Sequence, residues 1–406
     1  MPQVPRGKGL APLPRRQAAW WAATTGLALF TARRVPRHAA PQPLVGMEYE
    51  TWFACQAAPG APTVEAVRQK AARQVLALHP PQPSLNAPDL ALQLAELQSL
   101  EECTWINGWH GREATPLLGT YRSSDPRVLD QHLAWLESAG IDFLLVDWSN
   151  NLGGNWQSGT ALGIMAATYN LFEALVRRRS PLRLALLLGL DAGQVGTAPF
   201  LQQVDLVDQL VLRVPAFRAH YLEFHGRPLL PVYTGPTSNP PPAWDDPRFT
   251  VRWVNAFAET THANQFGCWS WLDRSPQVTY RFTASGQAVA EAVTVAAGYP
   301  GSGAPASWLA PDAGPRRHGA TYLAQWAVAF EARPEVVLLC QWNEFAQPDQ
   351  YDPEHSNDME PTAPHGYGVH GPGGWGTYYL DLTRTMVAAF HAGRPQPRVR
   401  LDPRVP

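Results

Sequence analysis

Short apolar runs that alternate with helix-like segments are the feature that most restricts the fold of this chain. The helix-like segments lie at 124–139, 163–179, 200–209, 320–331 and 378–392. The apolar runs are LVGMEYETWF (44–53), IDFLLVDW (141–148), LRLALLLG (182–189), PLLPVYT (228–234), FTVRWVN (249–255), FGCWSWL (266–272), AVTVAAG (292–298) and VVLLCQWN (336–343). Continuous apolar runs are typical of strands buried on both faces of a parallel sheet. Roughly eight such strands alternating with helices predict an α/β fold, a (β/α)8 TIM barrel with long βα-loop insertions.

A doubly wound parallel sheet is the competing interpretation of the same alternation. Such sheets bind nucleotides at a glycine-rich turn, and no GxGxxG or Walker-type loop follows an early apolar run in this sequence. Cys268 and Cys340 lie inside apolar runs, which indicates two small buried side chains. We therefore expect a single barrel domain over 44–395, followed by a C-terminal tail at 396–406.

The segment 1–43 differs from the rest of the chain. Arg15 and Arg16 precede QAAWWAATTGLALFTA (17–32), an apolar stretch of signal-peptide length that is too short for a comfortable membrane span. The following region, around 38–40, is a poor cleavage site. Export to a secreted or periplasmic location is the preferred interpretation, and an uncleaved N-terminal anchor is the alternative.

Charge and motif content exclude several classes of function. The net charge is −2, and lysines and arginines are scattered along the chain, so there is no basic stripe for a nucleic acid. The absence of GxSxG disfavours a serine hydrolase. The 16 tryptophans are numerous enough to fill a large core and also to offer flat faces to sugar rings.

Polar residues follow the apolar runs at the positions where parallel strands would end. The C-terminal ends of all barrel strands meet at one face, where active sites are built. We therefore expect several acidic and amide side chains to converge on that face. The candidates are Glu48, Glu50, Asp147, Asn150, Asp191, Asp273, Asn343 and Glu344.

Two facing carboxyl groups are what cleavage of a glycosidic bond requires. One protonates the leaving oxygen, and the other acts as nucleophile or activates a water or a neighbouring hydroxyl. We expect Glu344 and Asp147 to be catalytic, with Asp191 as a further candidate. The expected substrate-binding residues are Glu50, Trp52, Trp148, Asn150, Asp273, Trp342 and Asn343. A strand-end acid can instead pair with an arginine or cap a helix, and this structural role is favoured for Asp191 and Asp273.

Two sequence blocks resemble the endo-α-mannosidase-like glycoside hydrolases of families 99 and 71. The block WNEFAQPDQYDPEHSNDMEPT (342–362) is similar to their last-strand Trp-Asn-Glu motif and the loop that ends in Glu-Pro. The block GTYRSSDPRVLDQHLAWLESAGIDFLLVDW (119–148) is similar to their Tyr-Ser-Ser-Asp-Pro turn, helix and following strand. The resemblance extends over about 48–361 and implies a TIM-barrel glycosidase.

The resemblance implies a role for Glu344 and leaves the proton donor open. Glu344 matches the motif's first glutamate, which in the endo-mannosidases assists attack by the sugar's own 2-hydroxyl group. Their general acid lies three residues later, where this chain has Gln347. Because a glutamine cannot donate that proton, another acid must do so, and Asp147 is the first candidate, with Glu50 and Asp191 behind it.

The loop 347–362 is rich in acids and amides. The resemblance matches Glu360 to a later glutamate, which implies that it holds the loop or contacts a sugar hydroxyl, so Glu360 joins the substrate-binding candidates. Oxygen-rich loops can bind Ca²⁺, but this spacing lacks the glycine of an EF-hand. We expect solvated acids or sugar contacts here, with no metal and no cofactor.

The sequence as a whole predicts a glycoside hydrolase that acts on an oligosaccharide or polysaccharide at the C-terminal face of the barrel. The alternative is a non-catalytic barrel that binds carbohydrate, in which Gln347 marks lost turnover. No nucleic acid is expected as a partner, and no membrane partner beyond the N-terminal anchor that the alternative interpretation of 1–43 provides.

Overall fold

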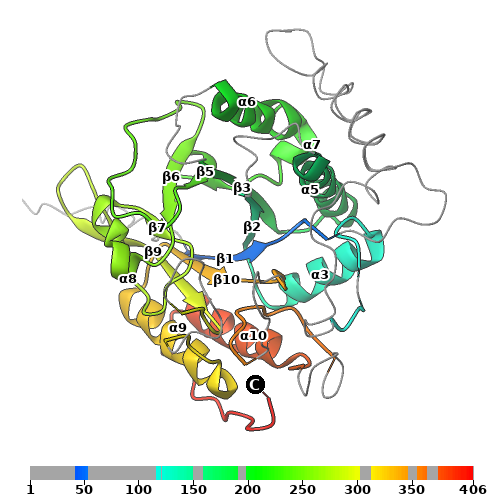
Figure 1. The fold of residues 1–406 in the computed structure, drawn as a ribbon, viewed down its shortest axis with the longest axis vertical. Helices are drawn as coiled ribbons and strands as arrows, with labels where there is room; N and C mark the ends of the chain where they lie inside the picture. The colour runs from blue at the N-terminus through cyan, green and yellow to red at the C-terminus, as the bar shows by residue number, and fades with distance from the viewer. Residues whose placement is uncertain are drawn as a thin grey trace, which may run out of the picture. The chain divides into compact units, whose positions relative to one another are not determined.

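Parallel strands form a nearly closed barrel surrounded by helices in the computed structural model of this chain (Figure 1). In the described residues, the barrel strands follow the order β7-β6-β5-β3-β2-β1-β10-β9, and every neighbouring pair in the ladders is parallel. Their bounds are β1 Leu44–Tyr49, β2 Phe143–Trp148, β3 Arg183–Gly189, β5 Arg227–Tyr233, β6 Thr250–Asn255, β7 Trp269–Ser270, β9 Ala288–Ala296 and β10 Val336–Cys340. The predicted TIM barrel is therefore confirmed.

The structure describes residues 42–53, 116–119, 121–149, 159–190, 198–301, 312–345, 354–363 and 374–405. All of them belong to one compact unit, Pro41–Pro406. Several sequence-based predictions lie outside these ranges, namely the export signal, Asn150, Asp191, and the first part of the acidic loop with Gln347. No helix within the described ranges is both long and apolar enough to cross a bilayer.

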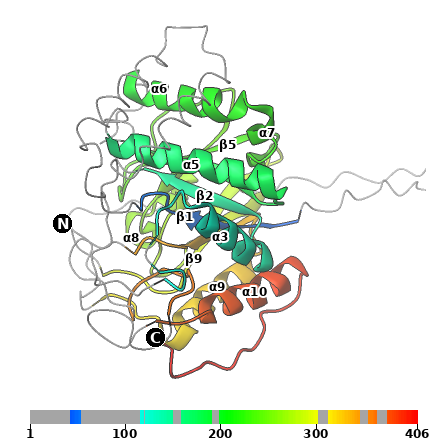
Figure 2. The same ribbon diagram turned by 90° about the vertical axis from the view of Figure 1, so that its right-hand side faces the viewer.

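Helices pack around the strands on their outer side (Figures 1 and 2). The longer ones are α3 Pro126–Ser138, α5 Gly159–Arg178, α6 Ala198–Val207, α9 Ala320–Ala332 and α10 Tyr378–His391. The short ones are α7 Pro215–Arg218, α8 Ala258–Thr261, the π-helix η2 Asp208–Leu212 and the 3-10 helices η3 Ala263–Phe266 and η4 Arg317–Gly319. Helix α3 begins as the sequence predicts, because Asp125 accepts a hydrogen bond from the Arg127 N–H at 2.9 Å and Pro126 starts the helix.

The alternation of side chains along each strand separates the barrel interior from the layer under the helices. On β2, Phe143 and Leu145 pack with other interior side chains, whereas Leu144 and Val146 belong to the larger core beneath the helices. The buried free thiols of Cys268 and Cys340 confirm the prediction for these residues. This period of two means that Asp147 shares the inward face of β2, and that its neighbour Trp148 points the other way.

Two short antiparallel strands were not predicted. Strand β8, Thr279–Phe282, pairs with the first half of β9, and β4, Glu223–Phe224, pairs with β5. Strand β8 has exposed Tyr280 and Phe282, so its side chains do not form the continuous apolar run from which the barrel strands were recognised. No backbone ladder joins the described strands β7 and β9, and side chains close the barrel there: Thr294 donates to the Ser270 carbonyl.

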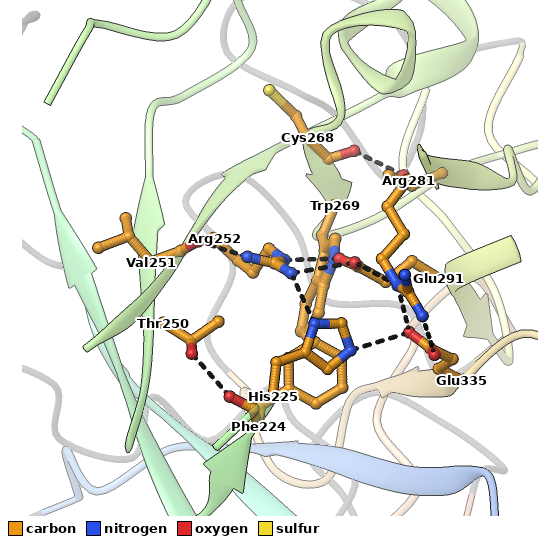
Figure 3. Close-up of polar contacts among 11 residues, drawn as sticks. Phe224, His225, Thr250, Val251, Arg252, Cys268, Trp269, Arg281, Glu291 and Glu335 are labelled. Atoms are coloured by element: carbon orange, nitrogen blue, oxygen red, sulfur yellow. Dashed lines mark hydrogen bonds and ion pairs between the residues drawn. The ribbon is translucent and has the colours of Figure 1, made fainter. Parts of the chain in front are cut away.

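A network of charged side chains braces the N-terminal end of the barrel across this closure (Figure 3). Glu291 on β9 accepts hydrogen bonds from Arg252 Nε at 2.6 Å and from Trp269 Nε1 at 2.7 Å. Glu335, just before β10, is bound by Arg281 Nε at 2.9 Å and by His225 Nε2 at 3.1 Å. The network thus links strands β6, β7, β8 and β9 with the β4–β5 turn at His225 and with Glu335 just before β10.

Breaking this network should destabilise the barrel. Glu291→Ala leaves the Arg252 guanidinium, with 21% of its side chain exposed, without its buried partner. We expect a loss of about 2–4 kcal/mol in the free energy of unfolding, measured by urea denaturation.

The matched control is Asp130→Ala, which removes an ion pair with Arg177 on the helical surface, where both side chains are exposed. Its effect should stay below about 1 kcal/mol. Equal losses in the two variants would contradict the bracing role of Glu291.

Candidate active site

Carboxyl groups from three neighbouring strands converge at the C-terminal end of the barrel. Strand β1 carries Glu48 and leads to Glu50, β2 carries Asp147, and Glu344 follows β10. Asp147 and Glu344 both act electrostatically on Glu48 and on Glu50, which shows that the four groups lie close to one another. The structure thus brings together two residues expected to be catalytic, Asp147 and Glu344, and Glu50, expected to bind substrate.

Glu50 and Asp147 form a hydrogen-bonded carboxyl pair. Burial is the largest cause that raises the pKa of Glu50 well above its usual range, and Asp147, Glu344 and Glu48 raise it further. Burial also raises the pKa of Asp147, although hydrogen bonds from Ser149 and from Glu50 favour its charged form. Because the pKa of each group is raised, the pair favours a state in which a proton lies between the two carboxyl groups.

Glu48 is a buried acid whose hydrogen-bond donor among the described residues is the Cys340 thiol. Only 3% of the residue is exposed, and both carboxyl oxygens are buried. Burial raises its pKa well above the usual range; the Cys340 thiol lowers it, whereas Asp147 and Glu344 raise it. The neutral, protonated form of Glu48 is thus favoured in the folded protein.

Glu344 is partly exposed and is fixed from two sides. Its Oε2 accepts a hydrogen bond from Gln341 Nε2 at 2.6 Å. Its backbone N–H donates to Asp358 Oδ1 at 2.6 Å, and the Phe345 N–H donates to the same oxygen at 3.1 Å. Asp358, which the sequence placed among the loop acids, therefore holds the turn that presents Glu344.

Asn343 connects the ends of β10 and β1. Its Oδ1 accepts from the Glu50 N–H at 2.9 Å, and its Nδ2 donates to the Glu50 carbonyl at 3.2 Å. Asn343 is fully buried. It was expected to bind substrate, but in the structure it clamps the backbone of Glu50 beside Asp147.

Glu360 lies in a fully buried network on the helix side of the barrel. Tyr121 donates to Glu360 Oε2 at 2.6 Å, and His132 Nε2 contacts Oε1 at 3.1 Å. The other ring nitrogen of His132 contacts the Tyr49 hydroxyl at 2.8 Å. Since the Glu360 carboxylate is fully enclosed, the geometry favours the loop-holding role over a sugar contact.

Three of the expected stacking residues are core side chains. Trp148 is 2% exposed, and its Nε1 donates to Thr168 on α5 at 2.9 Å, on the outer face of β2. Trp342 is fully buried against His132 and Trp135, and Trp52 is also buried. Trp148 alternates with inward-facing Asp147 along β2 and therefore points away from the carboxyl groups. Since Trp52 and Trp342 are enclosed as well, the expectation that these three indole faces stack on sugar rings does not fit the structure.

Tyr233 and Trp271 are the aromatic side chains beside the carboxyl cluster. Their ring centroids lie 6.0 Å apart, and Trp271 is partly exposed. Burial is the main cause that raises the pKa of Tyr233, and the charges of Asp147, Glu48 and Glu344 add to it. The sequence analysis missed Tyr233 as a site residue, although its position near the end of the apolar run 228–234 was the signal that could have identified it.

Asp273 has a structural role in the described loops. It is fully buried; its Oδ1 accepts from the Ala258 N–H at 2.7 Å, and its Oδ2 accepts from the Gln277 N–H at 3.0 Å. Burial, together with neighbouring Glu259, raises the pKa of Asp273 to about 8. Asp273 therefore anchors loops instead of contacting a sugar, which agrees with the structural role that the sequence analysis favoured for it.

One group of potential metal ligands is found among the described residues, at the opposite end of the barrel. Ligand atoms of His225, Glu291 and Glu335 lie within 4.8 Å of one another. Both carboxylates are already paired with guanidinium groups, those of Arg252 and Arg281. This donor set is satisfied by ion pairs, and the two positive charges beside it disfavour a bound cation.

Comparisons with known proteins support the fold. No protein-family model and no curated protein matches the sequence. Among solved structures, a GH99 endo-alpha-mannosidase from Bacteroides thetaiotaomicron is similar over 86% of this chain and 98% of its own, with a TM-score of 0.50 and 14% identity. The same enzyme in complex with BIS-TRIS-Propane matches with a TM-score of 0.50 and 13% identity over 86% of this chain and 98% of its own.

A third structure, described as a glycoside hydrolase-like protein, has a TM-score of 0.47 and 10% identity over 85% of this chain and 94% of its own. At these identities the likeness establishes the barrel fold that this chain shares with the GH99 structure. It does not assign the chemistry, which has to be argued from the residues.

The buried acids should make stability depend on pH. A carboxyl group whose folded pKa lies above its unfolded value stabilises the fold fully below the unfolded value, near 4.3, and this stability is lost as the pH rises toward the folded pKa. Each such group contributes a slope of up to about 1.4 kcal/mol per pH unit. The raised pKa of Glu48 places it in this class.

We expect Glu48→Gln to remove the contribution of Glu48 to the dependence of the unfolding free energy on pH. Relative to wild type, the variant should gain more than about 1 kcal/mol in unfolding free energy between pH 5 and pH 8, measured by urea denaturation at each pH. A difference between the two proteins that stays constant over this range would show that Glu48 is already ionised in the folded state.

Proposed function

We propose that this protein is a glycoside hydrolase that cleaves glycosidic bonds by carboxylate acid/base catalysis at the C-terminal end of its barrel. The observation that carries the proposal is that Asp147, in hydrogen-bond contact with Glu50, and a partly exposed Glu344 belong to one electrostatic cluster. Active sites of this fold are built at that end. The likeness to the GH99 endo-alpha-mannosidase structure adds support from fold alone.

The two carboxyl groups fit complementary roles. Asp147 passes the proton of the Glu50–Asp147 pair to the leaving oxygen. Glu344 acts from its own side as nucleophile, or as the base that takes a proton from water or from the sugar's 2-hydroxyl. The fixing of Glu344 by Gln341 and Asp358 lowers the entropy lost when it reaches the reactive geometry.

The proposed substrate is a neutral oligosaccharide or polysaccharide, with Tyr233 and Trp271 as the aromatic surface for a sugar ring. The resemblance to families 99 and 71 motivates testing α-linked mannans and glucans first. The apolar segment at 17–32 supports an extracytoplasmic location, where such polymers are encountered.

Removing either acid should slow cleavage strongly, and substrates with activated leaving groups should separate the two roles. Against a panel of natural glycans, Glu344→Gln and Asp147→Asn should each lower kcat/KM on the order of 10²–10⁴-fold. With glycosyl fluorides or dinitrophenyl glycosides, whose leaving groups need no proton, Asp147→Asn should recover most of its activity and Glu344→Gln should not.

A control variant, Asp130→Asn, changes an exposed carboxylate on α3 and should retain wild-type rates. The proposal is contradicted if wild-type protein binds a glycan of the panel but cleaves none; that outcome would favour the non-catalytic carbohydrate-binding barrel.

The aromatic assignment is tested by comparing two tryptophans. Trp271→Ala should weaken glycan binding about tenfold, as measured by isothermal titration calorimetry, because a ring face for stacking is lost. Trp148→Ala should instead lower the unfolding free energy by about 3–5 kcal/mol, since its side chain fills the core under α5. Equal losses of glycan affinity in both variants would contradict the assignment.

A further inference from the structure

We infer that Asp147 and Glu50 share a single proton in the resting protein and that Glu50 is a positioning residue that keeps Asp147 able to donate this proton at neutral pH. The inference rests on the proposed function for its catalytic meaning. The sharing of the proton, however, is a property of the folded protein that can be measured without any substrate.

The first step of the argument is the direct contact between the two carboxyl groups. A hydrogen bond joins the Glu50 and Asp147 side chains. An ionised carboxylate only accepts hydrogen bonds, so a bond between two carboxyl groups requires a proton on one of them. Glu50 and Asp147 are 3% and 7% exposed, so water does not screen a second negative charge at this position.

The second step is that hydrogen bonds hold both residues in place. Asn343 binds the N–H and the carbonyl of Glu50, at 2.9 Å and 3.2 Å. The Ser149 N–H donates to Asp147 Oδ1 at 2.5 Å. A Cβ atom on Gly189 would lie 2.2 Å from the Ser149 carbonyl oxygen, so glycine is what allows this turn to pack against β3. The two carboxyl groups therefore cannot easily separate to relieve their repulsion.

The third step concerns the other titratable groups that face the pair. Among the described residues they are Glu48 on β1, Tyr233 on β5 and Glu344 after β10. Each of these groups is either neutral or negative, so none of them stabilises a second negative charge on Glu50 and Asp147. Their summed effect is to hold the shared proton more tightly, and the pair titrates as a unit.

The proton balance of the reaction follows from this arrangement. The shared proton passes through Asp147 to the leaving oxygen as the glycosidic bond breaks, and Glu344 takes one proton from the attacking water or hydroxyl group. At the end of the turnover the pair has lost one proton and Glu344 has gained one. Transfer back through solvent restores the resting state, so no outside reagent is needed.

The test compares Glu50→Gln with Glu48→Gln. Both variants replace a buried carboxyl group of β1 by an amide of the same shape, but only the first removes the proton partner of Asp147. The direct readout is the carboxyl ¹³C titration of aspartate-labelled protein, with the Asp147 signal identified by its loss in Asp147→Asn. Wild type should show Asp147 titrating in two coupled steps.

In Glu50→Gln we expect a single Asp147 step, lowered by at least about one pH unit relative to the upper step of wild type, because the amide donates to the carboxylate without competing for a proton. Glu48→Gln should retain both steps, and Glu50→Asp should restore them. The inference is overturned if Glu50→Gln retains two steps, or if Glu48→Gln abolishes them equally.

Kinetics provide the readout that ties the pair to catalysis. On the best glycan of the panel, the basic limb of the kcat/KM profile should move to lower pH by about one unit or more in Glu50→Gln, and less in Glu48→Gln. An unshifted limb would overturn the positioning role. If wild type cleaves no glycan while the two-step titration persists, the proposed function fails and the shared proton stands, so the two failures are distinguishable.

Discussion

The burial of carboxyl groups that face one another at one end of the barrel is the constraint on which the candidate site depends. A buried acid favours its protonated form, and two acids in contact can bond only through a proton. Glu50 and Asp147 meet both conditions. The same burial that makes these groups costly to ionise raises their pKa, which is the property that the proposed general acid needs.

This arrangement persists because a second layer of side chains holds it. Asn343 and Asp358 bind the backbones of Glu50 and Glu344, and Glu360 anchors the same loop through Tyr121 and His132. Buried Arg316 donates to the Asp358 carbonyl at 2.6 Å and lies over the Trp375 ring at 4.1 Å. Asp358 and Glu360, two described acids of this loop, thus support the carboxyl groups of the site.

The barrel was predictable because buried parallel strands leave continuous apolar runs, and each of the eight runs overlaps a barrel strand in the structure. The strand-end position of Glu344 and Asp147 followed from the same pattern. Trp148 was misassigned because the alternation was not applied at the end of β2: if Asp147 points inward, adjacent Trp148 must point outward. The Glu360–His132 contact joins residues 228 positions apart, so no local pattern could predict it.

Carboxylates have different neighbours at the two ends of the barrel. At the N-terminal end Glu291 and Glu335 are matched by Arg252 and Arg281, whereas the acids at the other end face one another. Among the described residues, the N-terminal network and the carboxyl cluster share no charged side chain. Under the proposed function, substitutions that change which sugar binds at the C-terminal end can therefore accumulate while the ion pairs at the N-terminal end keep stabilising the fold, which makes this architecture well suited to divergent evolution of specificity.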